Sequence, residues 1–339
     1  MTIAHEIIEE IRHQVSAHDG VLAEARARRN AVFQAVSTFP GVLRTASTGS
    51  LAIGFINHPV NDGDGAAVLE RQAYPSLGPD GDGVLPHATV NKIQNHIRPL
   101  LREIYPKVSV SKMKRGILVE FAEPLDDEQD PTVDLVIALN RREDDALWIP
   151  NLDENRWDPS HPERHVELFT RGDRLLRRTR AHVVRLGKAQ MKQFETSTLS
   201  SFNVAALSWE AIEKVESIDV ALSRFFRYAA TEIAARRTDD PAGVSGPIKL
   251  PEALQRQTIV SRLQRAADSL ERAVESGDDK DAVLSALAEV FFRYVEAPGI
   301  PTERNTIAQA LRSGTAITLP LSARPTPATT SYGGGRDKR

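Results

Sequence analysis

The sequence contains no cysteine among its 339 residues. This absence excludes disulfide bonds, thiolate metal ligands and thiol catalysis, and it is typical of a chain in a reducing compartment. An excess of one charge is also missing, because 43 Lys and Arg and 46 Asp and Glu residues leave a net charge of −3. That balance does not indicate a nucleic-acid activator or a protein that coats nucleic acid, although a local basic cleft is compatible with it.

Long hydrophobic runs are missing as well. No apolar stretch approaches the length of a membrane span. The N-terminal segment MTIAHEIIEEIRHQV is charged and helical in pattern, without a signal-peptide core. We therefore expect a soluble, cytoplasmic protein that binds no membrane. Hydrophobic residues make up 41% of the chain and charged residues 26%, which is the composition of a globular protein with ample core.

The first half of the chain mixes helical and strand patterns. Apolar spacing predicts helices over residues 3–37, with a break at Asp19-Gly20, and over residues 88–105. Short β-branched segments at residues 108–124 and 132–140 predict strands. The Gly-, Ser- and Thr-containing segment FPGVLRTASTGSLAIGF is typical of a loop that leads into a strand.

The second half is mostly helical, from Arg171 to about Val295, with long amphipathic stretches. We therefore predict an α+β fold with a mixed sheet in the first lobe, a C-terminal helical lobe, and the active site in the cleft between them. The expected parts are a catalytic lobe at 1–170 that includes the N-terminal helix, a helical lobe at 171–313 and a flexible tail at 314–339. The tail is rich in Pro, Ser, Thr and Gly.

Two aspartates stand two residues apart in the segment STGSLAIGFINHPVNDGDGAAVLE, at Asp62 and Asp64. In an extended chain, residues with this spacing point to the same side, so the two carboxylates repel each other unless a cation lies between them. A third acid, Asp134, interrupts the apolar strand PTVDLVIALN, where an ionised carboxylate is costly without a cation. Three such carboxylates make a hard oxygen site for Mg²⁺, or Mn²⁺ in its place, and two ions about 3.5–4 Å apart can support phosphoryl transfer.

A Gly-Ser pair precedes these acids. Gly49 and Ser50 offer backbone N–H groups and a hydroxyl that can cradle phosphates. Taken alone, the pair carries little information, and the segment NDGDG is also typical of a turn. The spacing from Gly49-Ser50 to the paired acids, together with Asp134 in a later strand, favours a nucleotide site.

Several segments resemble those of one enzyme family. GSLAIGFINHPVNDGD and VDLVIAL resemble the Gly-Ser, Asp-x-Asp and third-aspartate motifs of polymerase-β-like nucleotidyltransferases. The resemblance narrows to bacterial cyclic-oligonucleotide synthases (CD-NTases), relatives of cyclic GMP–AMP synthase and oligoadenylate synthetase, and covers roughly residues 20 to 310. Three later segments carry it: LWIPNLDENRWDPSHPERHVELF, RAHVVRLGKAQMK and LSSFNVAALSWEAI.

The resemblance implies a polymerase-β-like catalytic lobe and a role for each matching residue. Asp62, Asp64 and Asp134 would bind Mg²⁺ and carry catalysis. The nucleotide-binding residues would be Gly49, Ser50, Lys188, Ser200, Ser201 and Phe202, with Lys188 on the β- and γ-phosphates, a serine hydroxyl supporting it, and Phe202 against a base. The chain departs from the family pattern at Gly63 and Gly65, where relatives carry a bulky and an apolar residue.

The activity implied is the condensation of nucleoside triphosphates into a cyclic dinucleotide or short cyclic oligonucleotide. The substrates would be ATP, GTP or both, and pyrimidine nucleoside triphosphates are left open. Such enzymes are typical of anti-phage signalling operons, so operon-encoded regulators or effectors are expected partners. Two alternatives stay open. One is nucleotidyl transfer to an RNA or protein acceptor, and the other is a catalytically degenerate module that only binds nucleotides.

Two further patterns have a functional and a structural interpretation. The arginines between Arg171 and Arg185 can form a positive wall for nucleotides or a solvated helix face paired with acids. His161 and His165 have a spacing that suits zinc on a helix, but Pro159 and Pro162 disturb such a helix. A structural role is therefore the favoured interpretation for both histidines.

Overall fold

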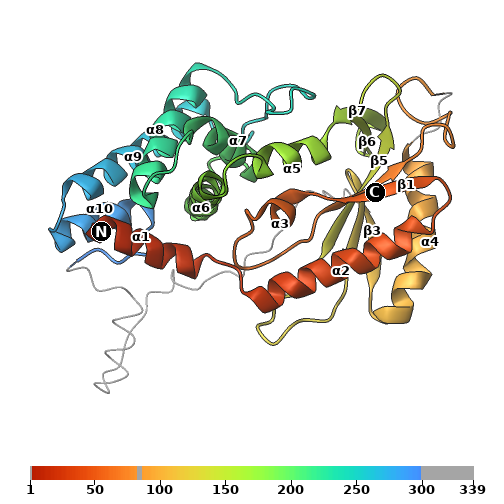
Figure 1. Ribbon diagram of the computed structural model, residues 1–339, viewed down its shortest axis with the longest axis horizontal. Helices are drawn as coiled ribbons and strands as arrows, with labels where there is room; N and C mark the ends of the chain where they lie inside the picture. The colour runs from red at the N-terminus through yellow and green to blue at the C-terminus, as the bar shows by residue number, and fades with distance from the viewer. Residues whose placement is uncertain (1, 82–85, 299–339) are drawn as a thin grey trace, which may run out of the picture.

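The computed structural model describes residues 2–81 and 86–298 (Figure 1). The tail expected at 314–339 lies outside the described residues, as do residues 82–85 of the expected Pro- and Gly-rich loop. In Figure 1 a sheet with its covering helices lies to the right and a group of helices lies to the left. None of the helices in the described ranges is both long and apolar enough to cross a membrane.

Seven strands of the described ranges form one mixed sheet, in the order β1-β2-β5-β4-β3, with β6 paired to β5 and β7 paired to β6. Strands β2 and β5 run parallel, and the other pairs are antiparallel. The strands are β1 (Val42–Ser47), β2 (Gly65–Leu69), β3 (Ser109–Met113), β4 (Gly116–Glu120), β5 (Val133–Asn140), β6 (Leu147–Asn151) and β7 (Arg156–Ser160).

Some helices pack on one face of this sheet, and others form a separate lobe beyond it. They are α1 (Ile3–Gln14), α2 (Asp19–Ser37), α3 (Gly49–Ile53), α4 (Pro86–Ile104), α5 (Pro162–Thr170), α6 (Arg174–Met191), α7 (Ser201–Ala211), α8 (Ile218–Ala235), α9 (Arg256–Glu275) and α10 (Lys280–Val290). The predicted break near Asp19-Gly20 and the predicted helix at 88–105 are confirmed as the gap before α2 and as α4.

Helices α2 and α4 cover one face of the sheet. Alternate residues of β5, namely Val133, Leu135 and Ile137, are fully buried in the core that these helices share with the strands. Because side chains alternate along a strand, the residues between them face the opposite side. That second face carries Asp134, and it is the face on which the site is built.

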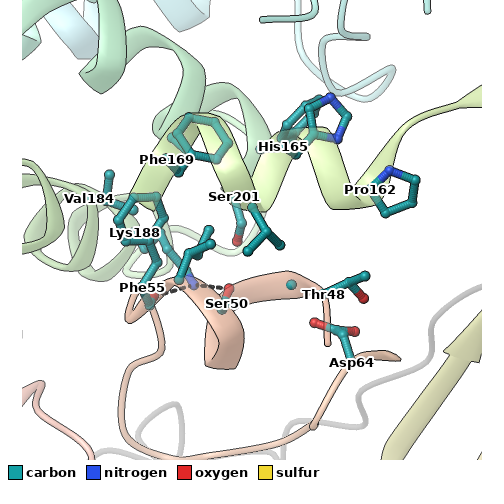
Figure 2. A pocket seen from close by; sticks show the side chains of 15 residues that line it. Thr48, Ser50, Phe55, Asp64, Pro162, His165, Phe169, Val184, Lys188 and Ser201 are labelled. Atoms are coloured by element: carbon teal, nitrogen blue, oxygen red, sulfur yellow. Dashed lines mark hydrogen bonds between the residues drawn. The ribbon is translucent and has the colours of Figure 1, made fainter. Parts of the chain in front are cut away.

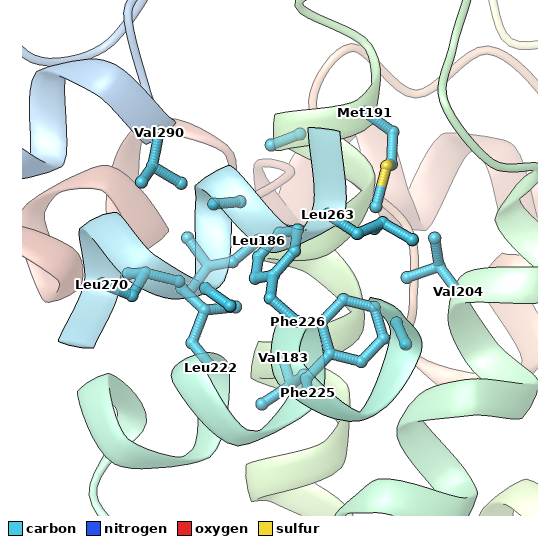
Figure 3. Close-up of a cluster of buried hydrophobic side chains, with 14 of the residues drawn as sticks. Val183, Leu186, Met191, Val204, Leu222, Phe225, Phe226, Leu263, Leu270 and Val290 are labelled. Atoms are coloured by element: carbon cyan, nitrogen blue, oxygen red, sulfur yellow. The ribbon is translucent and has the colours of Figure 1, made fainter. Parts of the chain in front are cut away.

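The helical lobe has its own core, in which α6, α8 and α9 interdigitate (Figure 3). Phe225 and Phe226 of α8 are fully buried there beside Leu263 of α9. Burial of such large side chains contributes about 1.5–3 kcal/mol each. The prediction of a helical second half is confirmed by this lobe.

Helix α1 packs in the helical lobe, although the sequence pattern placed it in the catalytic lobe. Ala4, Ile8 and Ile11 follow one helical stripe, and all three lie in the core formed with α6, α8 and α10. The apolar stripe predicted the helix but not the surface that it covers. The boundary at residue 170 itself stays a prediction.

The expected loop before the acids was also partly wrong. Residues 42–47 form strand β1, and a short helix, α3, follows it. Among the described residues, β1 is an edge strand that pairs only with β2, and most of its residues are half-exposed. Its polar composition, which includes Arg44 and Thr45, therefore concealed the strand pattern.

Candidate active site

The pairing of β2 with β5 brings the three aspartates together. Gly65 pairs with Leu135 in parallel register, so Asp64 and Asp134 are neighbours just where the two strands begin. Asp62 forms a bridge with Thr132, where the N–H of Gly63 donates to the Thr132 carbonyl at 2.8 Å. Asp62 and Asp64 thus lie in extended chain just before β2 rather than within a strand, and they still share one side.

One oxygen of each of Asp62, Asp64 and Asp134 lies within 4.8 Å of the others. Burial and the charges of Asp62 and Asp134 raise the pKa of Asp64 to about 7, and burial and Asp62 raise that of Asp134 to about 6. Carboxylates are hard oxygen ligands, and a divalent cation would relieve this repulsion. Within the described part of the chain, no other group of three His, Asp or Glu side chains fits a metal ion in this way.

Gly63 and Gly65 let helix α2 pack against the acidic segment. A Cβ on Gly65 would lie 2.3 Å from the ring of Phe33, and one on Gly63 would lie 3.0 Å from the carbonyl oxygen of Ala25. Both glycines face α2, so the alternating aspartates face the opposite side. The two departures from the family pattern therefore have a packing reason and do not spread the carboxylates apart.

Gly49 has a backbone conformation and a contact that both require glycine. Its φ is +66°, and an added Cβ would lie 1.6 Å from Oδ2 of Asp64. The N–H of Thr48 donates to the Asp64 carbonyl at 3.2 Å, and the backbone N–H of Ser50 donates to the Asp64 carboxylate. The Gly-Ser segment and the acids thus form one continuous site.

Lys188 joins the two lobes at this point. Its amino group, which comes from α6, donates to the Ser50 hydroxyl at 3.0 Å and to the Phe55 carbonyl at 2.9 Å (Figure 2). The residue is only 7% exposed, and burial and Lys192 lower the pKa of its ammonium to about 8. A buried cation beside Ser50 is suited to contact an anionic ligand.

A cavity of about 320 Å³ opens between these groups and helices α5, α6 and α7. Its polar lining includes Ser50, Asp64 and Lys188, and its apolar lining includes Phe169 and Phe202. The predicted site residues that line it are Gly49, Ser50, Asp64, Lys188, Ser201 and Phe202. Ser200 is not among the lining residues. Its hydroxyl accepts a hydrogen bond from the N–H of Asn203 and caps α7.

Comparison with solved structures identifies the fold of the chain. CdnC from E. coli MS115-1, determined with ATP, has a TM-score of 0.61 at 19% identity and covers 86% of this chain and 99% of its own. CdnG from Bradyrhizobium diazoefficiens, a CD-NTase determined with GTP, has a TM-score of 0.62 at 18% identity, covering 84% and 94%. This chain has the CD-NTase fold.

A third structure, the Vibrio cholerae cyclic AMP-GMP synthase DncV with the linear intermediate pppA(3′,5′)pG, has a TM-score of 0.55 at 14% identity. The match covers 87% of this chain and 88% of that one. No protein-family model and no curated protein matches the sequence. The predicted fold, with a mixed sheet and a C-terminal helical lobe, is confirmed.

Within the CD-NTase fold, His161 at the start of α5 and His165 within it have separate contacts. His161 caps the helix, where its Nδ1 accepts from the N–H of Arg164, and Nε2 of His165 lies 2.6 Å from Oδ1 of Asp240. Among the described residues the two side chains do not form a metal-binding group, which agrees with the structural interpretation. Asp240 could not be predicted from the sequence, because it lies 75 residues beyond His165 in a segment without a motif.

Part of the arginine run on α6 also has structural contacts. Arg177 donates to the Thr170 carbonyl at 2.7 Å. Arg180 donates to the Ile212 carbonyl at 2.8 Å, and its guanidinium stacks 3.9 Å from the ring centroid of Trp209. These contacts tie α6 to its neighbours and leave neither side chain free to form a positive wall.

Proposed function

We propose that this chain is a nucleotidyltransferase that condenses nucleoside triphosphates into a cyclic dinucleotide or a short cyclic oligonucleotide. The observation that supports this best is the convergence of Asp62, Asp64 and Asp134 next to the cavity that holds Lys188 and Ser50. The shared fold adds support, because its solved examples include a protein described as a cyclic AMP-GMP synthase.

The donor triphosphate binds at the polar wall of the cavity in this proposal. The backbone N–H of Gly49 and the hydroxyl of Ser50 contact phosphate oxygens, and Lys188 neutralises the β- and γ-phosphates. Ser201 supports the phosphates from α7. Phe202 stacks on a base, a contact worth about 1–3 kcal/mol.

Asp62, Asp64 and Asp134 would hold Mg²⁺, with Mn²⁺ as a substitute. When bound, such cations neutralise phosphate charge and align the attacking and leaving oxygens. The fit is supported by the raised pKa values of Asp64 and Asp134, which reflect burial and crowded negative charge. Gly49 contributes by letting Asp64 approach the phosphate-binding segment.

The proposed reaction is an in-line displacement. A ribose hydroxyl of the acceptor nucleotide forms a bond to the α-phosphorus of the donor, the bond from that phosphorus to the bridging oxygen breaks, and pyrophosphate leaves. We assign the hydroxyl proton to Asp134, whose carboxylate would hold the cation beside the attacking hydroxyl. The remaining residues act by positioning the two nucleotides.

Repetition of this step with the linear product turned in the same cavity would close the ring. We place the enzyme in the cytoplasm and in anti-phage signalling, with operon-encoded regulators or effectors as partners. Regulation by a partner is supported by one structural neighbour, CdnC from E. coli MS115-1, which was solved in a complex with HORMA-deltaN.

The test is incubation of the purified chain with labelled ATP, GTP, CTP and UTP and Mg²⁺ or Mn²⁺, followed by phosphatase treatment and chromatography. We expect phosphatase-resistant nucleotide products that disappear in Asp62→Asn and Asp134→Asn. Asp153→Asn is the matched control, because the Asp153 side chain is 64% exposed and, within the described part of the chain, pairs only with Lys114. Label on an RNA or protein acceptor would identify the first alternative, and binding without pyrophosphate release would identify the degenerate module.

A further inference from the structure

His165 lies on the apolar wall of the nucleotide cavity. Figure 2 shows it on α5, across the cavity from Ser50. Its ring packs edge to face against Phe202, with 4.9 Å between the ring centroids. The cation suited to phosphate, Lys188, reaches Ser50 on the opposite wall, where Asp64 also lies. A nucleotide whose phosphates contact Lys188 and Ser50 would therefore direct its base, and not its phosphates, towards His165.

The imidazole is held in one orientation by Asp240. This carboxylate accepts from the backbone N–H groups of Ala242, Val244 and Ser245 and from the Ser245 hydroxyl, at 2.9–3.2 Å. Its side chain is 1% exposed. Although burial raises the pKa of Asp240, hydrogen bonds from Ser245 and His165 lower it to about 2, so the carboxylate stays ionised and can only accept.

This contact determines which ring nitrogen of His165 carries the hydrogen. Nε2 lies 2.6 Å from the Asp240 carboxylate, so Nε2 carries the hydrogen and donates it. In the neutral ring, Nδ1 then presents a lone pair. Among the described residues, Nδ1 of His165 has no hydrogen-bond partner, so this acceptor is left for a ligand.

We propose that His165 reads the base of the bound nucleotide, its Nδ1 accepting a hydrogen bond from the exocyclic amino group of adenine or cytosine. The inference rests on the proposed function, because it assumes a nucleoside triphosphate in the cavity. Adenine carries this amino group at N6 and cytosine carries it at N4, whereas uracil has a carbonyl oxygen there that cannot donate. Asp240 is the positioning residue, since it fixes the tautomer of His165.

Two matched ligand pairs test the proposal by calorimetric binding to the full chain. ATP is compared with purine riboside 5′-triphosphate, which lacks the amino group, and CTP is compared with UTP. We expect the wild-type chain to favour the amino-bearing member of each pair by about tenfold, the value of one well-formed hydrogen bond. His165→Phe keeps a ring against Phe202 but removes both nitrogens, so both ratios should fall towards one.

Asp240→Asn is the second variant. An Asn amide can donate to Nε2, which moves the ring hydrogen to Nδ1 and should shift the preference from CTP towards UTP. His161→Ala is the control, because His161 caps the same helix but does not line this cavity. It should keep the wild-type ratios, and thermal unfolding verifies that each variant is folded.

Unchanged ratios in His165→Phe would overturn the inference and leave the His165–Asp240 contact as a structural tie between α5 and the loop that follows α8. Loss of base preference in His161→Ala as well would also overturn it. The proposed function is tested separately. It fails if the wild-type chain forms no transfer products while it still discriminates between the paired ligands.

Discussion

The carboxylate of Asp64 occupies the space that a side chain on Gly49 would fill, since an added Cβ would lie 1.6 Å from Oδ2. Gly49 begins the helix that supplies Ser50, and Asp64 immediately precedes the strand that pairs with the one carrying Asp134. This one contact therefore joins the proposed phosphate-binding segment to the proposed metal-binding carboxylates. A change at either residue should disturb both parts of the site.

Gly49→Ala tests this relationship. The variant combines a left-handed backbone conformation with a direct clash on Asp64, so we expect a loss of about 1–3 kcal/mol in the free energy of unfolding. Displacement of reacting groups by about 1 Å can cost 10²-fold in rate, so we expect at least about that loss in product formation. Urea unfolding and the transfer assay measure the two effects.

Gly277→Ala is the matched control for Gly49→Ala. Gly277 also has a positive φ, +57°, but a Cβ there would meet nothing within 4 Å. It should lose about 1–2 kcal/mol of stability from the backbone alone and keep the wild-type rate. Equal rates in the two variants would contradict the role given to Gly49.

Lys188→Met tests the buried cation. Removing the ammonium deprives an anionic ligand of a charge-assisted partner worth about 1.5–3 kcal/mol, so ATP affinity should fall by roughly 10- to 100-fold. Calorimetry with ATP measures this change. Lys192→Met, on the exposed neighbour four residues on, should change ATP affinity by less than about twofold, because exposed charges contribute little. Similar losses in both variants would show that only the net charge matters.

The crowded carboxylates make the stability of the metal-free chain depend on pH. In the unfolded chain Asp64 and Asp134 lose their protons near 3.8, whereas in the folded chain they hold them up to about 7 and about 6. Between about pH 4 and 7 the folded state thus binds more protons than the unfolded state, so its free energy of unfolding falls as pH rises.

Thermal unfolding in EDTA at pH 5 and pH 8 measures this dependence. Asp64→Asn should raise the Tm of the metal-free chain at pH 8 and have much less effect at pH 5, and Asp153→Asn should do neither. Mg²⁺ should stabilise the wild-type chain more at pH 8, where protons no longer compete for the carboxylates. Equal effects of Asp64→Asn at both pH values would contradict the crowded arrangement.

Gly65→Ala tests the close packing of α2 against the acidic segment. The added methyl would lie 2.3 Å from the Phe33 ring, so we expect a loss of about 1–3 kcal/mol in the free energy of unfolding. Phe33→Leu should compensate in part, with a coupling of about 0.5–3 kcal/mol in a double-mutant cycle. Gly20→Ala, with nothing within 4 Å in the first turn of α2, should instead stabilise by about 0.5–1 kcal/mol. Additive effects of the changes at positions 65 and 33 would contradict the contact.

The sequence predicted those features that depend on local pattern. Asp134 could be recognised because it interrupts an apolar strand, and the residues of Asp-x-Asp share a side wherever the chain is extended. The spacing of Ala4, Ile8 and Ile11 predicted a helix. Periodicity alone does not say which surface that helix covers. The helix was therefore expected in the catalytic lobe, whereas it packs in the helical lobe.

Features that depend on contacts between distant segments could not be predicted. The edge strand β1 is held by its pairing with β2 rather than by apolar alternation, so its sequence resembled a loop. Asp240 reaches His165 only because the loop after α8 folds back onto α5. The glycines at positions 63 and 65 became understandable once α2 was seen to lie against them.

The most direct test of the account is a crystal structure of the chain with Mn²⁺ and a non-hydrolysable ATP analogue, with anomalous diffraction used to locate the metal. We predict an anomalous peak bound by Asp62, Asp64 and Asp134 at about 2–2.3 Å from their oxygens, with the triphosphate on Ser50 and Lys188. A bound nucleotide without metal at these three carboxylates, or a metal bound elsewhere, would contradict the account.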